Sequence, residues 1–429
     1  MPLFEHQTKA LERTEKFNRC AYYHDMGLGK TYTGAAKMVE IGNKVNLVIC
    51  QKSKIGDWCE HLYQYYHRQY LIFDMTKKNQ FADFFNGYEY DRIGVINYEL
   101  VWRRKDLLKL KDFTLMLDES SLIQNETAKQ TKFIMNMYPS NIILLSGTPT
   151  SGKYENLWTQ AQLLGWNISK EKYDATYINW TLTPDDGSGF RHKIVDKDNP
   201  YKNVDRLKAK LRQYGADFLK TEDVVDLPEQ TFIPVMVDAP GTYKKFLEDD
   251  YVCIIWGDEP TPIELIGSST LTKRLYKRQL CSQYNKNKID ALADLIQSTS
   301  DRLIIFYNFN DELDILKGVC DAQNRPYSEV NGSVKDLTNY EEKVDSVTLV
   351  QYQAGAMGLN LQKCNKTIYF SLPDRSELFE QSKKRTHRIG QLQPCFYYLM
   401  MARNTIDEQM KAALDMRKDL TDYLFEEGE

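Results

Sequence analysis

The sequence predicts an α/β protein with two parallel-sheet lobes and a largely helical region between them. Two series of short apolar or β-branched runs indicate this fold, one within the first 150 residues and one after residue 300. Each run has the length of a buried strand and lies between segments compatible with helices, which is typical of parallel sheets. The length of 429 residues also exceeds what one minimal domain needs.

The first series of expected strands lies at 45–50, 93–97, 114–117 and 142–145, and the second at 303–307, 347–352, 367–370 and 396–400. The region from about 155 to 285 differs, with a helical stretch at 205–214, a loop-like run at 183–189 and scattered Pro and Gly. We therefore expect a first lobe at 1–215 with a helical extension from about 155, an inter-lobe linker and helical insertion at 216–285, and a second lobe at 286–429.

Composition excludes several classes of protein. The 56 Lys and Arg against 60 Asp and Glu give a net charge of -4, which is not the basic signature of histone-like or ribosomal proteins. Any nucleic-acid site must therefore be a local patch of the surface rather than a feature of the whole chain. Hydrophobic residues at 42% and charged residues at 27% are ordinary globular usage.

Targeting signals and cysteine frameworks are not apparent. No apolar run approaches the roughly 18 residues of a membrane span, and the first residues lack a basic-then-apolar signal pattern. The eight cysteines include no CxxC pair, so we expect reduced, mostly buried thiols rather than disulfides or a zinc site. These observations predict a soluble cytoplasmic protein with no membrane partner, and we expect a monomer.

The first chemical motif is a glycine-rich loop. Residues 25–31 follow an apolar stretch and precede a helix-prone segment, as a phosphate loop requires. The expected ATP-binding residues are Met26, Gly27, Leu28, Gly29, Lys30 and Thr31. Lys30 would reach the β- and γ-phosphates, and the Thr31 hydroxyl would ligate Mg²⁺. The strict pattern has Gly at position 24, where this chain has His24, and the alternative is a plain turn before a helix.

The second motif is an apolar strand that ends in two carboxylates, Asp118 and Glu119. In a nucleotide enzyme Asp118 would hold Mg²⁺, and Glu119 would orient and polarise the attacking water. The alternative is a solvated strand end. The carboxyl ends of parallel strands are where α/β sheets bind ligands, so the pairing with Lys30 and Thr31 favours catalysis.

Two further segments fit the same chemistry. The run at 144–150 is an apolar strand followed by a Ser-Gly-Thr-Pro turn, whose hydroxyls would link the carboxylates to a bound polymer. In 381–391, a helix would place Gln381, Arg385 and Arg388 on one face. Two such guanidiniums could neutralise charge on a triphosphate held by the other lobe, as arginine fingers do. A solvated helix face is the alternative.

In this order, the motifs resemble those of superfamily-two helicase-type ATPases of the Swi/Snf-like translocase group. Residues 4–7 resemble the glutamine motif, 25–31 motif I, 47–53 with Trp58 motif Ia, 95–99 motif Ib, 118–121 motif II, 146–149 motif III, 303–306 motif IV, 354–361 motif V and 381–391 motif VI. The His-Arg-Ile-Gly-Gln ending of 387–391 and the segment 218–228 resemble the Swi/Snf-like group rather than DEAD-box RNA helicases.

The resemblance implies two RecA-like lobes, with ATP and Mg²⁺ as cofactors and double-stranded DNA as the tracked partner. Lys30, Asp118, Glu119, Arg385 and Arg388 would be catalytic, Gln7 would read adenine, and Gly358 and Gln381 would join the ATP site. DNA contacts would come from Lys52, Ser53, Asn97, Tyr98, Thr148, Gly355 and Ala356. Such contacts go mainly to phosphates, because a translocase must hold every sequence.

The chain departs from the family at three places. Ser120 and Ser121 stand where a small residue and His are usual, residues 351–353 are not Ser-Thr-Arg, and residues 372–374 replace a Trp-Asn-Pro turn. None of these removes a residue that hydrolysis needs. The compact pattern resembles bacterial or bacteriophage members of the group.

Other interpretations of the cation-rich segment and of the function remain open. The cations Lys273, Arg274, Lys277 and Arg278 would form either a phosphate clamp or a solvated helix face. A strand-separating DNA or RNA helicase would use the same hydrolytic residues as a translocase. A third possibility is a nucleotide-gated clamp with little turnover.

Overall fold

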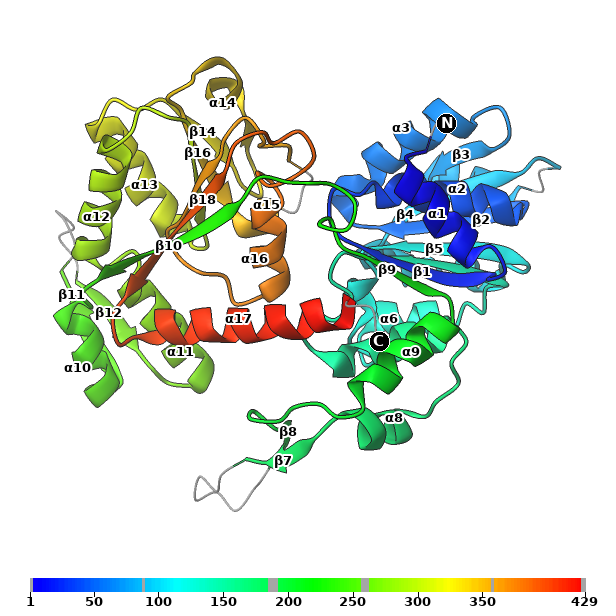
Figure 1. Cartoon of the computed structure of the whole chain (residues 1–429), viewed down its shortest axis with the longest axis horizontal. Coiled ribbons are helices and arrows are strands. Elements are labelled where there is room, and N and C mark those ends of the chain that lie inside the picture. The colour runs from blue at the N-terminus through cyan, green and yellow to red at the C-terminus, as the bar shows by residue number, and fades with distance from the viewer. Residues whose placement is uncertain (1–2, 87–88, 184–191, 256–261, 356–358, 426–429) are drawn as a thin grey trace. The chain divides into compact units, whose positions relative to one another are not determined.

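The computed structural model describes residues 3–86, 89–183, 192–255, 262–355 and 359–425. The chain divides into two units, the first made of Met1–Val225 with Lys418–Glu429 and the second of Asp226–Arg417. In Figure 1 the first unit begins in blue and contains the sheet labelled from β1 to β9, and the second contains the sheet labelled from β10 to β18. The predicted α/β fold with two parallel-sheet lobes is confirmed.

The first unit is built on a seven-stranded sheet in the order β3-β4-β2-β5-β6-β1-β9. All of its strand pairs are parallel. The strands are β1 (Arg19–His24), β2 (Val45–Cys50), β3 (Leu71–Asp74), β4 (Arg92–Asn97), β5 (Phe113–Asp118), β6 (Asn141–Leu145) and β9 (Ala216–Leu219). Because parallel strands end at the same edge, the loops that follow β1, β5 and β6 are neighbours.

Helices cover both faces of this sheet. They are α1 (Glu5–Thr14), α2 (Lys30–Ile41), α3 (Ile55–Tyr66), α4 (Lys78–Phe85), α5 (Tyr98–Val101) and α6 (Lys129–Met135), with short 3-10 turns η1 (Lys52–Lys54), η2 (Lys105–Lys109), η3 (Ser120–Ile123) and η4 (Tyr154–Leu157). Alternation along the strands divides the core, so that Val48 and Met116 pack in one apolar cluster and Leu47 and Leu115 in another.

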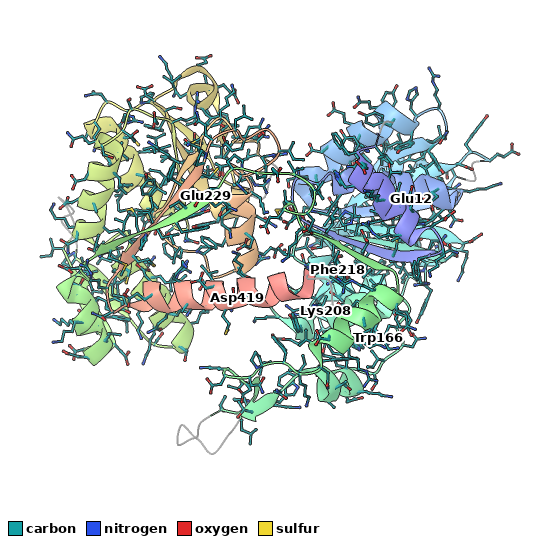
Figure 2. All side chains as sticks on the ribbon, viewed as in Figure 1. Glu12, Trp166, Lys208, Phe218, Glu229 and Asp419 are labelled. Carbon is teal, nitrogen blue, oxygen red and sulfur yellow. The ribbon has the colours of Figure 1, made fainter. Side chains whose placement is uncertain are left out.

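The helical extension of the first unit contains α7 (Trp158–Leu163), α8 (Lys170–Tyr177), α9 (Val204–Gln213) and a hairpin of β7 (Trp180–Leu182) and β8 (Lys193–Val195). Its core is aromatic. Trp166, labelled in Figure 2, stacks on Tyr214 with the ring centroids 5.9 Å apart and meets Tyr173 edge-on. This packing joins α7 and α8 to the end of α9.

The second unit has a seven-stranded sheet in the order β10-β18-β17-β13-β16-β14-β15, parallel except for the β14–β15 pair. The strands are β10 (Gln230–Val237), β13 (Leu303–Tyr307), β14 (Tyr327–Val330), β15 (Lys335–Asp336), β16 (Val347–Gln351), β17 (Lys366–Tyr369) and β18 (Cys395–Ala402). A separate hairpin is formed by β11 (Tyr251–Ile254) and β12 (Ile263–Ile266).

The helices of this part of the chain are α10 (Gly241–Asp249), α11 (Thr270–Cys281), α12 (Lys286–Gln297), α13 (Asn310–Ala322), α14 (Thr338–Glu342), α15 (Tyr352–Gly355), α16 (Ser376–Lys383) and α17 (Ile406–Phe425). The division between the two units passes through α17. Among the described residues, no helix has both the length and the apolar character to cross a membrane.

The predicted lobe boundaries differ from the observed units. The linker was expected from residue 216, but Ala216–Leu219 forms β9 and pairs with β1. Likewise, Gln230–Val237 forms β10 and pairs with β18 of the second sheet. Strand β9 was not predicted because it contains a charged residue, Asp217. The carboxylate of Asp217 is neutralised by partners from elsewhere in the unit.

Candidate functional site

The loop between β1 and α2 has the backbone of a phosphate cradle. Gly27 and Gly29 have positive φ angles of 92° and 72°, a region that favours glycine. A Cβ on Gly29 would lie 2.4 Å from Nε2 of Gln7, so a side chain there would displace the Gln7 amide from the loop. Helix α2 begins at Lys30 directly after this loop, and its first N–H groups and dipole suit an anion there.

The N-terminal helix supports the loop from outside. Nε2 of Gln7 donates to the carbonyl oxygens of Leu28 and Gly29 at 3.1 and 3.3 Å, and Oε1 accepts from the Phe4 N–H at 3.0 Å. The ring of His6 also contacts the Leu28 carbonyl at 3.0 Å. Gln7 is buried, so its observed role is to fix the loop. A direct contact between Gln7 and adenine stays a prediction.

Lys30 lies across the same loop. Its Nζ donates to the carbonyl oxygens of His24 and Asp25 at 2.9 and 3.3 Å. The turn after β6 comes close to this ammonium group, because a Cβ on Gly147 would lie 3.3 Å from Nζ of Lys30. The strand ends of β1 and β6 therefore meet at the lysine.

The two carboxylates follow β5, which pairs with β6 up to Asp118 opposite Leu145. Oδ2 of Asp118 accepts a hydrogen bond from Nε1 of Trp58 on α3 at 2.8 Å. Burial raises the pKa of Asp118, while the Trp58 hydrogen bond and the nearby Lys30 and Lys54 ammonium groups oppose that rise. Trp58 thus orients the Asp118 carboxylate through its hydrogen bond to Oδ2.

Glu119 has a left-handed backbone, with φ 55° and ψ 60°. A non-glycine residue in this region carries strain of order 1–3 kcal/mol, and such strain is frequent at functional sites. The Tyr98 hydroxyl stabilises the turn by donating to the Asp118 carbonyl at 2.9 Å. The turn directs the chain from β5 into η3 and fixes the position of the Glu119 side chain relative to Asp118.

The donor set fits a nucleotide with Mg²⁺. Thr31 and Asp118 supply a hydroxyl and a carboxylate, which are the oxygen ligands that Mg²⁺ accepts alongside phosphate and water. No group of three or more His, Cys, Asp or Glu that could hold a metal occurs in the described residues.

Gln160 on α7 joins three of these segments, and no sequence motif indicated this residue. Its Oε1 accepts from the hydroxyls of Ser120 and Tyr23 at 2.8 and 3.0 Å, and its Nε2 donates to the Pro149 carbonyl at 2.8 Å. The side chain is fully buried. It therefore links the end of β1, the turn after the carboxylates and the turn after β6, next to the position where the family usually has a histidine.

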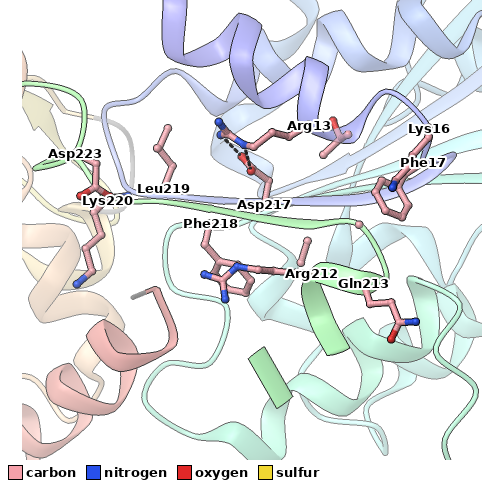
Figure 3. Close-up of a pocket in the computed structure, with 13 residues that line it drawn as sticks. Arg13, Lys16, Phe17, Arg212, Gln213, Asp217, Phe218, Leu219, Lys220 and Asp223 are labelled. Carbon is pink, nitrogen blue, oxygen red and sulfur yellow. Dashed lines mark hydrogen bonds and ion pairs between the residues drawn. The ribbon is translucent and has the colours of Figure 1, made fainter. Parts of the chain in front are cut away.

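His24, the departure from the strict loop pattern, is part of a charged network whose Arg13–Asp217 pair is drawn in Figure 3. Its Nε2 lies 2.7 Å from Oδ2 of Asp217 on β9, and Arg13 of α1 binds both oxygens of that carboxylate at 2.6 and 2.9 Å. Burial lowers the pKa of His24, although Asp217 opposes this. Burial alone would raise the pKa of Asp217, but the hydrogen bonds from His24 and Arg13 outweigh it and the net shift is downward. The network is a neutral imidazole, a carboxylate and a guanidinium.

The predicted DNA contacts of the first unit have different environments. Lys52 and Ser53 are exposed on η1. Asn97 is buried and its amide donates to Glu99 at 2.6 Å, and Thr148 is buried in the turn after β6. The side chain of Tyr98 is 3% exposed and its hydroxyl supports the carboxylate turn. A side-chain contact from Tyr98 to DNA does not fit this burial.

In the second unit, helix α16 ends at Lys383. Gln381 is buried within it and donates to Glu377 at 3.3 Å. Arg385 and Arg388 lie in the turn that follows, so the expected single helix face with both arginines is wrong. The α-helix ends where the backbone changes to i→i−3 hydrogen bonds, from the Arg385 N–H to the Ser382 carbonyl and from the Thr386 N–H to the Lys383 carbonyl.

This turn is held by two residues of the His-Arg-Ile-Gly-Gln ending. His387 contacts the Pro228 carbonyl at 2.7 Å through Nε2, and Gln391 donates to the carbonyls of Gln362, Cys364 and Thr386. The Leu361 N–H donates to the Arg385 carbonyl at 3.1 Å, which ties the motif V segment to the turn. Gly355 ends α15, whereas Ala356 and Gly358 lie outside the described residues.

The cation cluster on α11 is mostly neutralised. Arg274 and Arg278 both bind the carboxylate of Asp374, and Lys273 binds Asp250. Arg278 also donates to the Leu372 carbonyl at 3.0 Å. These contacts tie α11 to the segment that replaces the usual Trp-Asn-Pro turn. They favour a structural role for Arg274 and Arg278 over a phosphate clamp.

The chain matches two protein-family models. The model of the SNF2-related domain family matches residues 8–286, and the model of the helicase conserved C-terminal domain matches residues 287–390. The chain is 23% identical over 453 residues to the mouse SWI/SNF-related matrix-associated actin-dependent regulator of chromatin subfamily A member 1, covering 94% of this chain and 41% of that protein.

Two other similar proteins are microbial. The putative ATP-dependent helicase/translocase YwqA of Bacillus subtilis is 22% identical, covering 94% of this chain and 46% of that protein. The ISWI chromatin-remodeling complex ATPase ISW1 of Saccharomyces cerevisiae is 22% identical, covering 92% and 38%. The chain thus spans about two fifths of the length of these relatives. Among solved structures, the Sulfolobus solfataricus SWI2/SNF2 ATPase core in complex with dsDNA is similar, with a TM-score of 0.45 and 20% identity over 98% of this chain and 92% of that one.

Proposed function

Because the chain belongs to the SNF2-related family, we propose that it is an ATP-hydrolysing, DNA-dependent translocase that tracks along double-stranded DNA and moves or remodels structures bound to it. The observation that carries the proposal is the convergence of Lys30, Asp118 and the Gly147 turn at adjacent strand ends of one sheet. The names of similar proteins include an ATP-dependent helicase/translocase and a chromatin-remodeling ATPase. These names support the proposal of an ATP-driven motor.

The first unit supplies the hydrolytic groups. Lys30 neutralises the β- and γ-phosphates, and the N–H groups of the Gly27–Gly29 turn and of the first turn of α2 bind their oxygens. Bound Mg²⁺ would neutralise developing phosphate charge. Thr31 and Asp118 would hold the ion, with Asp118 oriented by the hydrogen bond from Trp58. Glu119 orients water for attack on the γ-phosphate.

The second unit would contribute Arg385 and Arg388 as transition-state cations, with Gln381 and Gly358 at the nucleotide. This assignment rests on the family resemblance. The His387 and Gln391 contacts support it by holding the turn of the two arginines in one conformation. Preorganised charges cost little reorganisation during reaction, so a fixed turn suits a catalytic role.

The DNA surface of the first unit would centre on the exposed η1 residues Lys52 and Ser53. Thr148 and the backbone after β4 lie at the same edge of the sheet. In the second unit the segment at Gly355 and Ala356 would take the corresponding contact. Phosphate contacts of this kind are independent of sequence and sensitive to salt.

A strand-separating DNA or RNA helicase would use the same hydrolytic residues. A nucleotide-gated clamp is disfavoured because Lys30, Asp118, Glu119, Arg385 and Arg388 are all present, whereas a degenerate ATPase usually lacks one of them.

The test is the ATPase rate measured with no polynucleotide, single-stranded DNA, duplex DNA and RNA. We expect the largest stimulation by duplex DNA, falling steeply as salt rises because binding releases counterions. Triplex displacement beside forked-duplex unwinding then distinguishes tracking from strand separation. Equal stimulation by RNA, or unwinding without triplex displacement, would favour the helicase alternative.

A further inference from the structure

One buried amide on α7 contacts three strand-end segments of the candidate site. Oε1 of Gln160 accepts from the hydroxyls of Ser120 and Tyr23, and Nε2 donates to the Pro149 carbonyl. The carbonyl can only accept and each hydroxyl can donate, so these partners determine which way the amide points. The Gln160 side chain is fully buried. Bulk water therefore does not compete for its hydrogen bonds.

The Ser120 contact leads to the carboxylate that would orient water. Ser120 directly follows Glu119 in the chain, and their Cα atoms are therefore about 3.8 Å apart. The Leu122 N–H donates to the Glu119 carbonyl at 2.9 Å, so the backbone turns tightly at this point. A hydrogen bond that holds the Ser120 side chain thus also holds the backbone from which the Glu119 carboxylate extends.

The Tyr23 contact leads to the lysine that would face the phosphates. Tyr23 directly precedes His24 at the end of β1. The His24 carbonyl accepts from Nζ of Lys30 at 2.9 Å. The Gln160 amide is therefore tied to the strand end that holds the lysine.

The Pro149 contact leads to the same lysine through the turn after β6. Pro149 lies two residues after Gly147, where a Cβ would lie 3.3 Å from Nζ of Lys30. Through its three contacts, Gln160 thus joins the turn of Glu119 to two segments that border Lys30.

Other contacts between α7 and the turn after β5 lie farther from the carboxylate. Thr159 donates to the Ile123 carbonyl at 2.9 Å. Ser121 stands where the family usually has a histidine, and its buried hydroxyl has no hydrogen-bond partner in the described part of the chain. Of these positions, the one that Gln160 holds is the nearest in sequence to Glu119.

We propose that Gln160 is a positioning residue for ATP hydrolysis, which holds the Glu119 carboxylate in register with the phosphates that Lys30 faces. This inference rests on the proposed function. Attack on the γ-phosphate requires the water and the leaving oxygen roughly in line, and a misplacement of about 1 Å can cost about a hundredfold in rate. Gln160 is hydrogen-bonded to protein groups and is buried, so it acts through Glu119.

The test compares Gln160→Met with Gln162→Met in the full chain. Methionine is similar in length to glutamine but has no N–H donor and only a weak acceptor. Gln162 lies on the same helix, and its amide donates to the Trp166 and Ile168 carbonyls at 3.0 and 2.6 Å instead. The control therefore also loses an amide with two or more partners, away from the site.

We expect Gln160→Met to lower DNA-stimulated kcat by about tenfold, because the carboxylate is misplaced. Affinity for a fluorescent ATP analogue should not change, since the phosphate loop keeps its own contacts with Gln7. Gln162→Met should change neither quantity. Melting temperatures of both variants are measured alongside, because a role in stability alone lowers the melting temperature but not the kcat of the folded protein.

Ser120→Ala is a milder variant, because it removes one hydroxyl and leaves Gln160 with its two other partners. We expect its kcat to fall by about threefold, as for the loss of one neutral hydrogen bond. The double variant with Gln160→Met should be no slower than Gln160→Met alone, because both changes remove the same bond. Ser120→Ala decides the question if Gln160→Met does not fold.

Wild-type kcat in the folded Gln160→Met and Ser120→Ala variants, with only a lower melting temperature, would overturn the inference. Loss of ATP affinity without loss of kcat would also overturn it, because Gln160 would then support the phosphate loop. Failure of the proposed function is distinguishable: the wild-type chain itself would hydrolyse no ATP with any polynucleotide, and the inference would then fail with it.

Discussion

Lys30 and Glu119 carry opposite charges after β1 and β5, the two strands on either side of β6, and their loss should have different consequences. Lys30→Ala removes the cation that faces the phosphates, so we expect lost hydrolysis and weaker ATP binding. Glu119→Gln keeps the shape and the Asp118 site but removes the carboxylate that polarises water. In that variant ATP should bind and persist.

Equilibrium binding of a fluorescent ATP analogue, together with phosphate release, separates these two outcomes. Wild-type turnover in Lys30→Ala would contradict the phosphate-loop assignment. Loss of ATP binding in Glu119→Gln would show that the left-handed Glu119 position is structural rather than catalytic.

Trp58 orients the Asp118 carboxylate, a role that the sequence motif containing it did not predict. Its indole N–H donates to Asp118 at 2.8 Å, and a hydrogen bond to a charged group contributes about 1.5–3 kcal/mol. We expect Trp58→Phe to raise the Mg²⁺ concentration that half-saturates nucleotide binding by about tenfold, which corresponds to the lower part of that range.

The measurement is the Mg²⁺ dependence of affinity for the fluorescent analogue. Trp102→Phe is the matched control, since Trp102 contacts Arg103 and Lys129 rather than the carboxylates. An unchanged Mg²⁺ dependence in Trp58→Phe, with a lowered melting temperature only, would restrict Trp58 to packing.

At the scale of elements, the Arg13, Asp217 and His24 network joins α1, β9 and β1. A buried His24 with a lowered pKa binds a proton more weakly when folded than when unfolded. The stability that His24 contributes is therefore fully present above the unfolded pKa of about 6.5 and is lost as pH falls from there through the lower folded pKa. The lowered pKa of Asp217 acts in the same direction below about pH 4.

We therefore expect the urea midpoint of the chain to fall between about pH 7.5 and pH 5.5. His24→Gln keeps a side-chain donor for Asp217 but does not titrate, so its midpoint should vary less over this range. His67→Gln is the control, because His67 is exposed and lies outside the network. An identical pH dependence in His24→Gln and wild type would exclude His24 as the cause.

The charges of α11 and η1 predict different salt responses. Arg274 binds Asp374, whereas Lys52 is exposed. Lys52→Ala should weaken duplex DNA binding and reduce the slope of log affinity against log salt by about 1, the loss of one phosphate contact. Arg274→Ala should leave the slope unchanged. A matching reduction in Arg274→Ala would restore the phosphate-clamp interpretation.

The elements that the sequence predicted correctly are those with continuous apolar runs, such as the central strands β2, β5 and β13. Burial on both faces leaves little choice of residue there. Strand β9 was not predicted because Asp217 interrupts its apolar pattern. Helix α16 was expected to continue beyond Lys383, because the hydrogen bonds that end a helix cannot be read from composition. Gln160 was missed for a third reason. Its partners Tyr23, Ser120 and Pro149 are distant in sequence and meet only through the fold.

At the scale of the whole molecule, the hydrolytic candidates are divided between two units. Lys30, Asp118 and Glu119 belong to the first unit, and Arg385 and Arg388 to the second. If Arg388 acts on the γ-phosphate, hydrolysis depends on closure of the two units, and DNA that binds both would promote closure. This division makes a prediction that separates binding from chemistry.

Arg388→Ala should leave ATP affinity nearly intact, because the first unit makes most ground-state contacts. The same variant should lower DNA-stimulated turnover by about a thousandfold, which is the low end of the effect of an arginine finger. Arg388→Lys should rescue little, since an ammonium lacks the planar fork that spans two phosphate oxygens. Nucleotide affinity and DNA-stimulated kcat are to be measured side by side for both variants. Arg417→Ala is a control in the same unit, since Arg417 contacts the Asp374 carbonyl instead. Should affinity collapse while kcat at saturating ATP stays near wild type, Arg388 is a ground-state ligand and closure does not control hydrolysis.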